Sequence, residues 1–204
     1  MIRNYIHQIR DILRTISWLL NGKIGNPPHI IKQAIIKNYA IIFNKGVLVE
    51  TGSFMGYMIF SQLHTFDEIY SVEIADYYYQ RLLKIFKGSK KVKLVLGDSA
   101  EKLPSVLQEI KKDAIFWLDG HFSGGMTGQS KLGVSPVIFE VDLILKNRSN
   151  FKDIILIDDA RLFGTDGYPT IDRLLEVFGD ELKNYTWFVD DDVIRFIPKE
   201  ISKI

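Results

Sequence analysis

From Gly46 onward, short apolar runs alternate with segments of helical length and amphipathic spacing. The runs are continuously apolar, as strands are when helices cover both faces of a parallel sheet. Strand alternating with helix predicts an α/β fold with a Rossmann-like, doubly wound sheet. The predicted strands are Val47 to Glu50, Ile69 to Glu73, Val92 to Leu96, Ala114 to Asp119 and Ile154 to Asp158, and the predicted helices lie near residues 55–65, 75–87, 100–111, 136–147 and 169–182.

The end of the chain departs from this alternation. Residues 185–189 and 193–198 flank an acidic turn at residues 190–192, which predicts a C-terminal antiparallel hairpin. The turn itself is expected to be solvated. The sheet should therefore be mainly parallel, and residues 46–204 should form its domain.

Residues 1–45 are predicted to form an N-terminal helical extension of that single structural domain. Apolar residues recur at steps of three and four over residues 2–20, which places them on one face of an amphipathic helix. Pro27 and Pro28 then open a second helix that runs to about Phe43. The apolar face of the first helix is expected to pack against another surface. Packing on the domain, or on the second subunit of a homodimer, is favoured over a peripheral membrane contact through Trp18.

Composition excludes several classes of protein. The 26 basic and 25 acidic side chains leave a formal charge of +1, so no overall field recruits nucleic acid or an anionic membrane. Cysteine does not occur, which excludes a disulfide framework, a thiolate zinc site and a cysteine nucleophile. Charged residues interrupt residues 1–20, so this segment predicts neither a signal peptide nor a membrane span. We expect a cytoplasmic protein.

Each predicted parallel strand ends at or near a carboxylate. Ligands of an open α/β sheet bind outside the carboxyl ends of its strands. A single acid at such a point is more often a helix cap than a ligand. Caps would be served equally well by Ser, Thr or Asn, however, and this series is acidic throughout, which predicts a binding site at this edge. The acids are Glu50, Glu73, Asp98, Asp119, Asp158 and Asp159.

The loop after the first predicted strand carries Glu50, Gly52, Ser53 and Gly56. It resembles the first motif of the class I S-adenosylmethionine (SAM)-dependent methyltransferases, and the resemblance extends from Gly46 to the end of the chain. Glycines let the backbone approach the methionine end of the cofactor. The carboxylate answers the positive charge of SAM directly or through water. The resemblance thus implies SAM as the cofactor, bound by these four residues.

Two further positions match the family's cofactor site. Glu73 stands where the family places an acid that accepts hydrogen bonds from both ribose hydroxyls. Asp98, followed by Ser99, matches the position beside the adenine, where a carboxylate accepts from the exocyclic amine. Capping is the alternative role for Glu73 and for Asp98, and Asp98 is able to serve both roles.

Asp119, Asp158 and Asp159 are similar in pattern to the metal-dependent O-methyltransferases of the catechol and macrocin types, which hold Mg²⁺ after the fourth and fifth strands. Hard divalent cations prefer oxygen ligands. A metal there would lower the pKa of an acceptor hydroxyl and orient its oxygen. Asp159 stands where the catechol type has an amide, so the match is partial. The resemblance implies Mg²⁺, or another divalent cation, at these three residues.

His121, two residues beyond Asp119, is the best candidate for a general base, because an imidazole takes up a proton near neutral pH. His121 and Asp119 are the candidate catalytic residues. The alternative is a structural histidine that ties down the glycine-rich loop. Arg161 either clamps an anionic group of the substrate or pairs with Asp158 or Asp159. Residues 123–133 have the length of a lid over the site.

The favoured function is a SAM-dependent O-methyltransferase acting on a hydroxyl of a small molecule, such as a sugar or a glycosylated metabolite. A second hypothesis is a module that binds SAM without chemistry. A third is an NAD-dependent Rossmann enzyme, which is disfavoured because the spacing from Gly52 to Gly56 lacks the G-x-G-x-x-G arrangement. We expect no nucleic-acid partner and no integral membrane segment.

Overall fold

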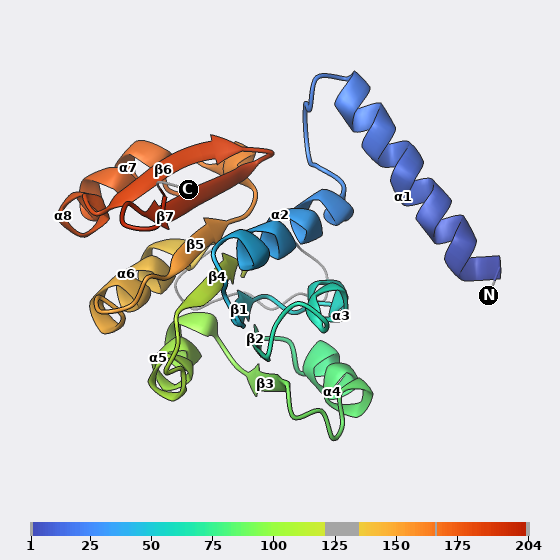
Figure 1. Ribbon diagram of the computed structural model, residues 1–204, viewed down its shortest axis with the longest axis horizontal. Coiled ribbons are helices and arrows are strands. Elements are labelled where there is room, and N and C mark those ends of the chain that lie inside the picture. The colour runs from blue at the N-terminus through green and yellow to red at the C-terminus, as the bar shows by residue number, and fades with distance from the viewer. Residues whose placement is uncertain (1, 121–134, 166, 203–204) are drawn as a thin grey trace.

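The computed structural model describes residues 2–120, 135–165 and 167–202. Its seven strands form one sheet in the order β3-β2-β1-β4-β5-β7-β6 (Figure 1). Strands β1 to β5 are parallel, whereas β7 runs antiparallel to both β5 and β6. The predicted Rossmann-like sheet and its C-terminal hairpin are therefore confirmed. The strands are β1 (Val47–Thr51), β2 (Glu68–Glu73), β3 (Val92–Leu96), β4 (Ala114–Leu118), β5 (Ile154–Ile157), β6 (Tyr185–Asp190) and β7 (Val193–Pro198).

Helices cover both faces of this sheet, as continuously apolar strands require. One buried cluster joins α2, α3 and α4 to the sheet, and the other joins α5, α6, α7 and α8 to the opposite face. Leu48 on the interior strand β1 is paired with Ile69 and Ile115 and has no exposed surface. The helices are α1 (Ile2–Leu20), α2 (His29–Ile42), α3 (Tyr57–Gln62), α4 (Asp76–Ile85), α5 (Ser99–Glu109), α6 (Val137–Asn147), the 3₁₀ helix η1 (Ala160–Leu162), α7 (Ile171–Val177) and α8 (Gly179–Leu182).

The segment predicted as one helix over residues 169–182 forms the two helices α7 and α8. Thr170 caps the start of α7 by accepting a hydrogen bond from the backbone N–H of Arg173 at 3.0 Å. Phe178 ends α7, and Gly179 begins α8. Glycine has a low helix propensity, which explains the break at this point.

The two N-terminal helices differ in their packing. Ile36 of α2 is fully buried against the sheet, so α2 belongs to the core. Helix α1 lies away from the sheet in Figure 1 and leaves apolar side chains exposed, including Leu13 and Leu20, the latter 81% exposed. Its amphipathic pattern is confirmed, whereas the homodimer and the division of the chain at residue 45 stay predictions. Within the described residues, no helix is both long enough and apolar enough to span a bilayer.

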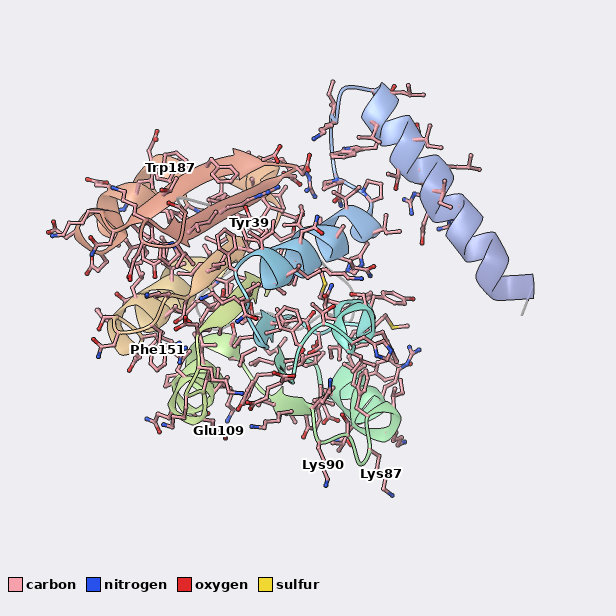
Figure 2. The ribbon with its side chains drawn as sticks, viewed as in Figure 1. Tyr39, Lys87, Lys90, Glu109, Phe151 and Trp187 are labelled. Atoms are coloured by element: carbon pink, nitrogen blue, oxygen red, sulfur yellow. The ribbon has the colours of Figure 1, made fainter. Side chains whose placement is uncertain are left out.

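The C-terminal hairpin closes one edge of the sheet. Strand β7 is buried along its length, whereas β6 is the exposed edge strand and carries Trp187 on its outer side (Figure 2). The turn between them contains Asp191 and Asp192 with positive φ angles of 51° and 63°, which Asp tolerates in tight hairpins. The turn is less solvated than predicted, because Asp191 pairs with Lys23 at 2.7 Å and Asp192 pairs with Arg161.

Candidate functional site

Gly52 brings the end of β1 into contact with the end of β4. Its φ angle is +88°, and a Cβ atom placed there would lie 2.6 Å from the backbone oxygen of Asp119. The backbone N–H of Asp119 in turn donates to the carbonyl oxygen of Thr51 at 3.1 Å. A side chain at residue 52 would collide with backbone, so the glycine is required by this close approach.

Gly56 and Phe54 shape the rest of the glycine loop. Gly56 has a φ angle of +76°, and a Cβ there would lie 2.5 Å from the side chain of Leu82 on α4. Phe54 also has a positive φ angle, 46°, which is uncommon for a bulky residue. Its ring centroid lies 4.7 Å from that of Tyr78. Backbone strain of this kind concentrates at ligand sites.

Glu50 is a buried acid at the end of β1. Its Oε2 accepts a hydrogen bond of 2.5 Å from the hydroxyl of Ser71, which in turn shares one of 2.6 Å with Ser53. Burial raises the pKa of Glu50 to about 8, the Ser71 hydrogen bond opposes this shift, and the nearby Asp119 and Glu73 add to it. A cation beside Glu50 would favour its ionised form.

Glu73 ties the glycine loop to the start of α4. Its Oε2 accepts from the backbone N–H of Phe54 at 2.7 Å, and its Oε1 accepts from that of Ala75 at 2.8 Å. Burial raises the pKa of Glu73, and these amide hydrogen bonds oppose the increase. The backbone N–H groups of Ser53 and Ile74 oppose the increase as well, so the carboxylate faces the amides of both loops.

Asp98 caps helix α5. Its Oδ1 accepts a hydrogen bond from the backbone N–H of Ala100 at 3.1 Å, which confirms the capping role. The ligand role predicted for Asp98 and for the adjacent, buried Ser99 stays a prediction.

Sequence reasoning missed Glu140 on α6. It is only 1% exposed, and its Oε1 has no hydrogen-bond partner among the described residues. Burial raises the pKa of Glu140 to about 7, against the opposing effect of the nearby Ser99 and Thr51 hydroxyls. A Cβ on Gly120 would lie 3.2 Å from Oε1, so this acid lies directly beside Gly120, just after β4. The signal in the sequence was an acid at helical spacing among apolar residues, between Val137 and Ile144.

The three acids predicted as metal ligands do converge. One carboxylate oxygen from each of Asp119, Asp158 and Asp159 lies within 4.8 Å of the others. Asp159 has a positive φ angle of 58°, and its backbone N–H donates to Asp158 Oδ1 at 2.7 Å. We call these three residues the acid cluster.

Lys32 of α2, which sequence reasoning also missed, lies against this acid cluster. Its Nζ is 2.6 Å from Asp158 Oδ2 and 3.0 Å from Asp159 Oδ1, and the residue is 6% exposed. Burial lowers the pKa of Lys32, but the two carboxylates outweigh burial and the net pKa is raised, so the side chain is an ammonium. No motif marked this lysine, because it joins the acids across 126 residues of sequence.

The pKa values of the two acids beside Lys32 shift in opposite directions. Burial and the proximity of Asp119 raise the pKa of Asp158 well above its usual range. The pKa of Asp159 is lowered, because the attraction of Lys32 and Arg161 exceeds the effect of burial. The donor set of the acid cluster is suited to a hard cation. The residues do not fit a metal as they stand, because an ammonium contacts two of the three carboxylates.

Arg161 of η1 forms ion pairs within the chain. Its Nη1 donates to Asp159 Oδ1 at 2.8 Å and also to Asp192 Oδ2, and its backbone N–H donates to Asp192 Oδ1 at 2.7 Å. These contacts favour the structural alternative for Arg161 over the substrate clamp. His121 and the loop of residues 123–133, predicted as base and lid, lie outside the described residues.

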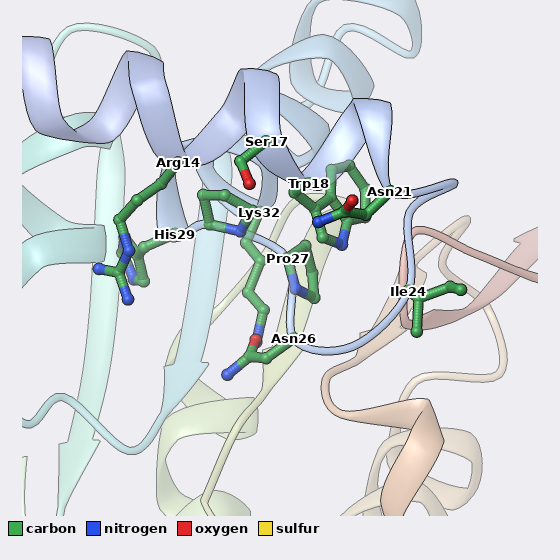
Figure 3. A pocket seen from close by; sticks show the side chains of 10 residues that line it. Arg14, Ser17, Trp18, Asn21, Ile24, Asn26, Pro27, His29 and Lys32 are labelled. Atoms are coloured by element: carbon green, nitrogen blue, oxygen red, sulfur yellow. The ribbon is translucent and has the colours of Figure 1, made fainter.

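A pocket of about 500 Å³ lies between α1, the following loop and the start of α2 (Figure 3). Lys32 lines this pocket as well as contacting the acid cluster. Lys32 is thus the residue that links this pocket of the N-terminal region to the acid cluster. The other residues that line it are Arg14, Ser17, Trp18, Asn21, Ile24, Asn26, Pro27, Pro28 and His29.

No protein-family model matches this chain, and no curated protein sequence matches it either. Its structure is similar to several solved methyltransferases. With the SAH-bound methyltransferase PaMTH1 of Podospora anserina it shares 15% identity and a TM-score of 0.57, over 94% of this chain and 87% of that one. With the O-methyltransferase of Bacillus cereus in complex with SAH, the values are 11% identity and a TM-score of 0.56, over 82% and 80% of the chains.

TomG, an O-methyltransferase from Streptomyces achromogenes involved in tomaymycin synthesis and solved with SAM, is also similar in structure. It shares 15% identity and a TM-score of 0.54, over 82% of this chain and 78% of that one. At these identities the likeness shows the fold. This chain has the fold of the class I SAM-dependent methyltransferases.

Proposed function

We propose that this chain is a SAM-dependent methyltransferase that methylates a hydroxyl group of a small molecule. The observation that carries the proposal is the glycine loop, in which Gly52 packs on the backbone of Asp119 beside the buried acids Glu50 and Glu73. The loop lies at the carboxyl edge of the sheet, where ligands of open α/β folds bind. The likeness of the fold to methyltransferases solved with SAM or SAH supports the same conclusion.

The proposed cofactor site uses the residues of this edge. Gly52, Ser53 and Gly56 would contact the methionine end, Glu73 the ribose, and Asp98 with Ser99 the adenine. Glu50 would compensate the positive charge of the sulfonium. A buried carboxyl with a pKa of about 8 is strongly stabilised in its ionised form by a neighbouring positive charge. When bound, SAM supplies the methyl group that is transferred.

The protein's part in this reaction is to orient the acceptor and exclude water. A pocket of about 500 Å³ has the size of a small-molecule site. A sugar or glycosylated metabolite stays the proposed acceptor. Asp119 and His121 are the proposed groups that take the proton from its hydroxyl.

The magnesium prediction rests on the acid cluster of Asp119, Asp158 and Asp159. These carboxylates supply the oxygen ligands that Mg²⁺ prefers. Lys32 and Arg161 already neutralise Asp159, and Lys32 also contacts Asp158. No step of the proposed reaction therefore passes through a metal.

These ion pairs favour one alternative function, a module that binds SAM without chemistry. Acids held by Lys32 and Arg161 are less available to bind a substrate or a metal. Such a module would bind SAM and SAH but would transfer no methyl group to any of a panel of hydroxyl acceptors.

The proposal is tested by calorimetric titration of SAM, SAH (the demethylated product) and NAD into the native protein. We expect binding of SAM and SAH with a Kd on the order of micromolar, and no binding of NAD. Glu73→Ala should weaken both, whereas Glu109→Gln, at the exposed far end of α5, is the matched control (Figure 2). A native protein that binds neither SAM nor SAH contradicts the proposed function.

A further inference from the structure

We infer that Lys32 supplies the cation of the acid cluster, in the place where a divalent metal would bind, and that its ammonium faces the acceptor pocket. The second part of this inference rests on the proposed function. The first part concerns only the contacts of Lys32 with Asp158 and Asp159, and it is tested without any cofactor.

The ammonium and a metal ion would need the same space. Mg²⁺ binds carboxylate oxygens at about 2.0–2.1 Å. Nζ of Lys32 lies 2.6 Å from Asp158 Oδ2 and 3.0 Å from Asp159 Oδ1. A metal bound to those two oxygens would overlap with Nζ and would be repelled by its charge. The two cations therefore exclude one another.

Two basic side chains of the chain compensate part of the negative charge at the site. Lys32 is shared by Asp158 and Asp159, and Arg161 is shared by Asp159 and Asp192. Buried carboxylates are costly unless cations and hydrogen bonds compensate them. The two basic side chains supply part of that compensation from within the chain.

Lys32 is held in this position by the packing of α2. Ile35 and Ile36, one turn further along the helix, are buried in the core. The backbone oxygen of Gln33 accepts a hydrogen bond from Gln62 of α3 at 2.9 Å. Pro28, in an extended conformation, precedes the first residue of α2. Because the helix is fixed on both sides, the ammonium is a built part of the site rather than a surface side chain that fills a gap.

The ammonium also has capacity for a ligand. Lysine has three N–H donors, and the contacts with Asp158 and Asp159 use two of them. The same side chain lines the pocket between α1 and α2, as Figure 3 shows beside Asn26 and Pro27. The third donor would then bind an acceptor oxygen in that pocket. In this way Lys32 would stabilise negative charge on that oxygen, the role that a metal would otherwise have.

The experiment is a titration of Mn²⁺ followed by electron paramagnetic resonance, with the native protein, Lys32→Met and Lys32→Arg. The native protein and Lys32→Arg, which keeps the cation, should show no Mn²⁺ bound at the cluster. Lys32→Met should bind Mn²⁺ at least about tenfold more tightly, because a competing unit charge is removed. Adding Asp158→Asn to Lys32→Met should abolish that gain. A merely structural lysine would not produce a new metal site.

The native titration decides the question even if Lys32→Met fails to fold. Native binding of Mn²⁺ that Asp158→Asn abolishes would overturn the inference, and so would a folded Lys32→Met that gains no Mn²⁺. SAM and SAH are titrated into the same samples. If the native protein binds neither SAM nor SAH, the proposed function is contradicted, but the result of the metal titration is unchanged.

Discussion

The two halves of the carboxyl edge satisfy their acids in different ways. At the ends of β1 and β2, Glu50 is held by the hydroxyl of Ser71 on the neighbouring strand, and Glu73 by backbone N–H groups of the loops that follow the two strands. At the end of β5, Asp158 and Asp159 are held by a lysine from the N-terminal region. The first half keeps neutral donors and two acids with raised pKa values, which suits a cationic ligand. The second half brings its own cation, which suits an acceptor with a polar or anionic oxygen.

The change expected to have the largest effect is Asp158→Ala, in the second half. It leaves the buried ammonium of Lys32 with one carboxylate fewer, and breaking a buried ion pair costs about 3–5 kcal/mol. We expect that loss in the free energy of unfolding, measured by urea denaturation, together with loss of methyl transfer. Binding of SAM should persist, since the first half is intact. An unchanged free energy of unfolding would show that the second half is not held together by the ion pair of Lys32 and Asp158.

Glu50→Gln tests the first half through pH. In the folded protein Glu50 stays protonated up to a pKa of about 8, whereas its ordinary pKa is 4.5. The unfolded state binds fewer protons between these values, so Glu50 lowers the free energy of unfolding as pH rises through this window, by at most about 1.4 kcal/mol per pH unit. Glu50→Gln should flatten this slope, as seen in urea denaturation at several pH values.

The same variant separates the charge of Glu50 from its shape. Gln replaces the carboxyl with a neutral group of similar size, so binding of SAM, which carries a sulfonium charge, should weaken more than binding of SAH, which lacks that charge. Calorimetry with both compounds measures the difference. Equal weakening would mean that Glu50 does not face the sulfonium.

Gly52→Ala tests whether the two halves depend on their backbone contact. The new Cβ would lie 2.6 Å from the carbonyl oxygen of Asp119, at a φ angle of +88°. We expect a loss of about 1–3 kcal/mol in stability and weaker SAM binding. Gly179→Ala is the matched control, because a Cβ there has nothing within 4 Å. Thermal unfolding measures the stability of both variants, and calorimetry measures their SAM affinity. Equal values for the two variants would contradict the close approach of residue 52 to the backbone of Asp119.

The smallest expected effect concerns Asp98, where capping and ligand binding coincide. Asp98→Ala removes the hydrogen bond to the N–H of Ala100 and should cost about 1 kcal/mol of stability. Asp98→Asn keeps the cap and should cost little. If Asp98 also binds adenine, SAM affinity falls in Asp98→Ala beyond what the loss of stability explains. If both variants bind SAM as tightly as the native protein does, Asp98 acts only as a helix cap.

Much of the fold was predictable because its signals are local. The apolar runs mark β1 to β5, and the alternation of residues 185–198 marks the hairpin. The position of the acids followed from the rule that parallel strands end at one edge, so the convergence of Asp119, Asp158 and Asp159 was predicted correctly. The break between α7 and α8 was missed, although Gly179 was the signal for it.

The sequence by itself determined the order of strands and helices, the glycine loop and the acidic edge, since periodicity and strand ends are properties of neighbouring residues. Only the tertiary structure decided what each acid contacts. It placed Lys32 on the acid cluster across 126 residues and set the unpaired oxygen of Glu140 beside Gly120. The physical reason is that the charge and pKa of a buried acid depend on groups that packing brings near it, and those groups come from distant parts of the chain.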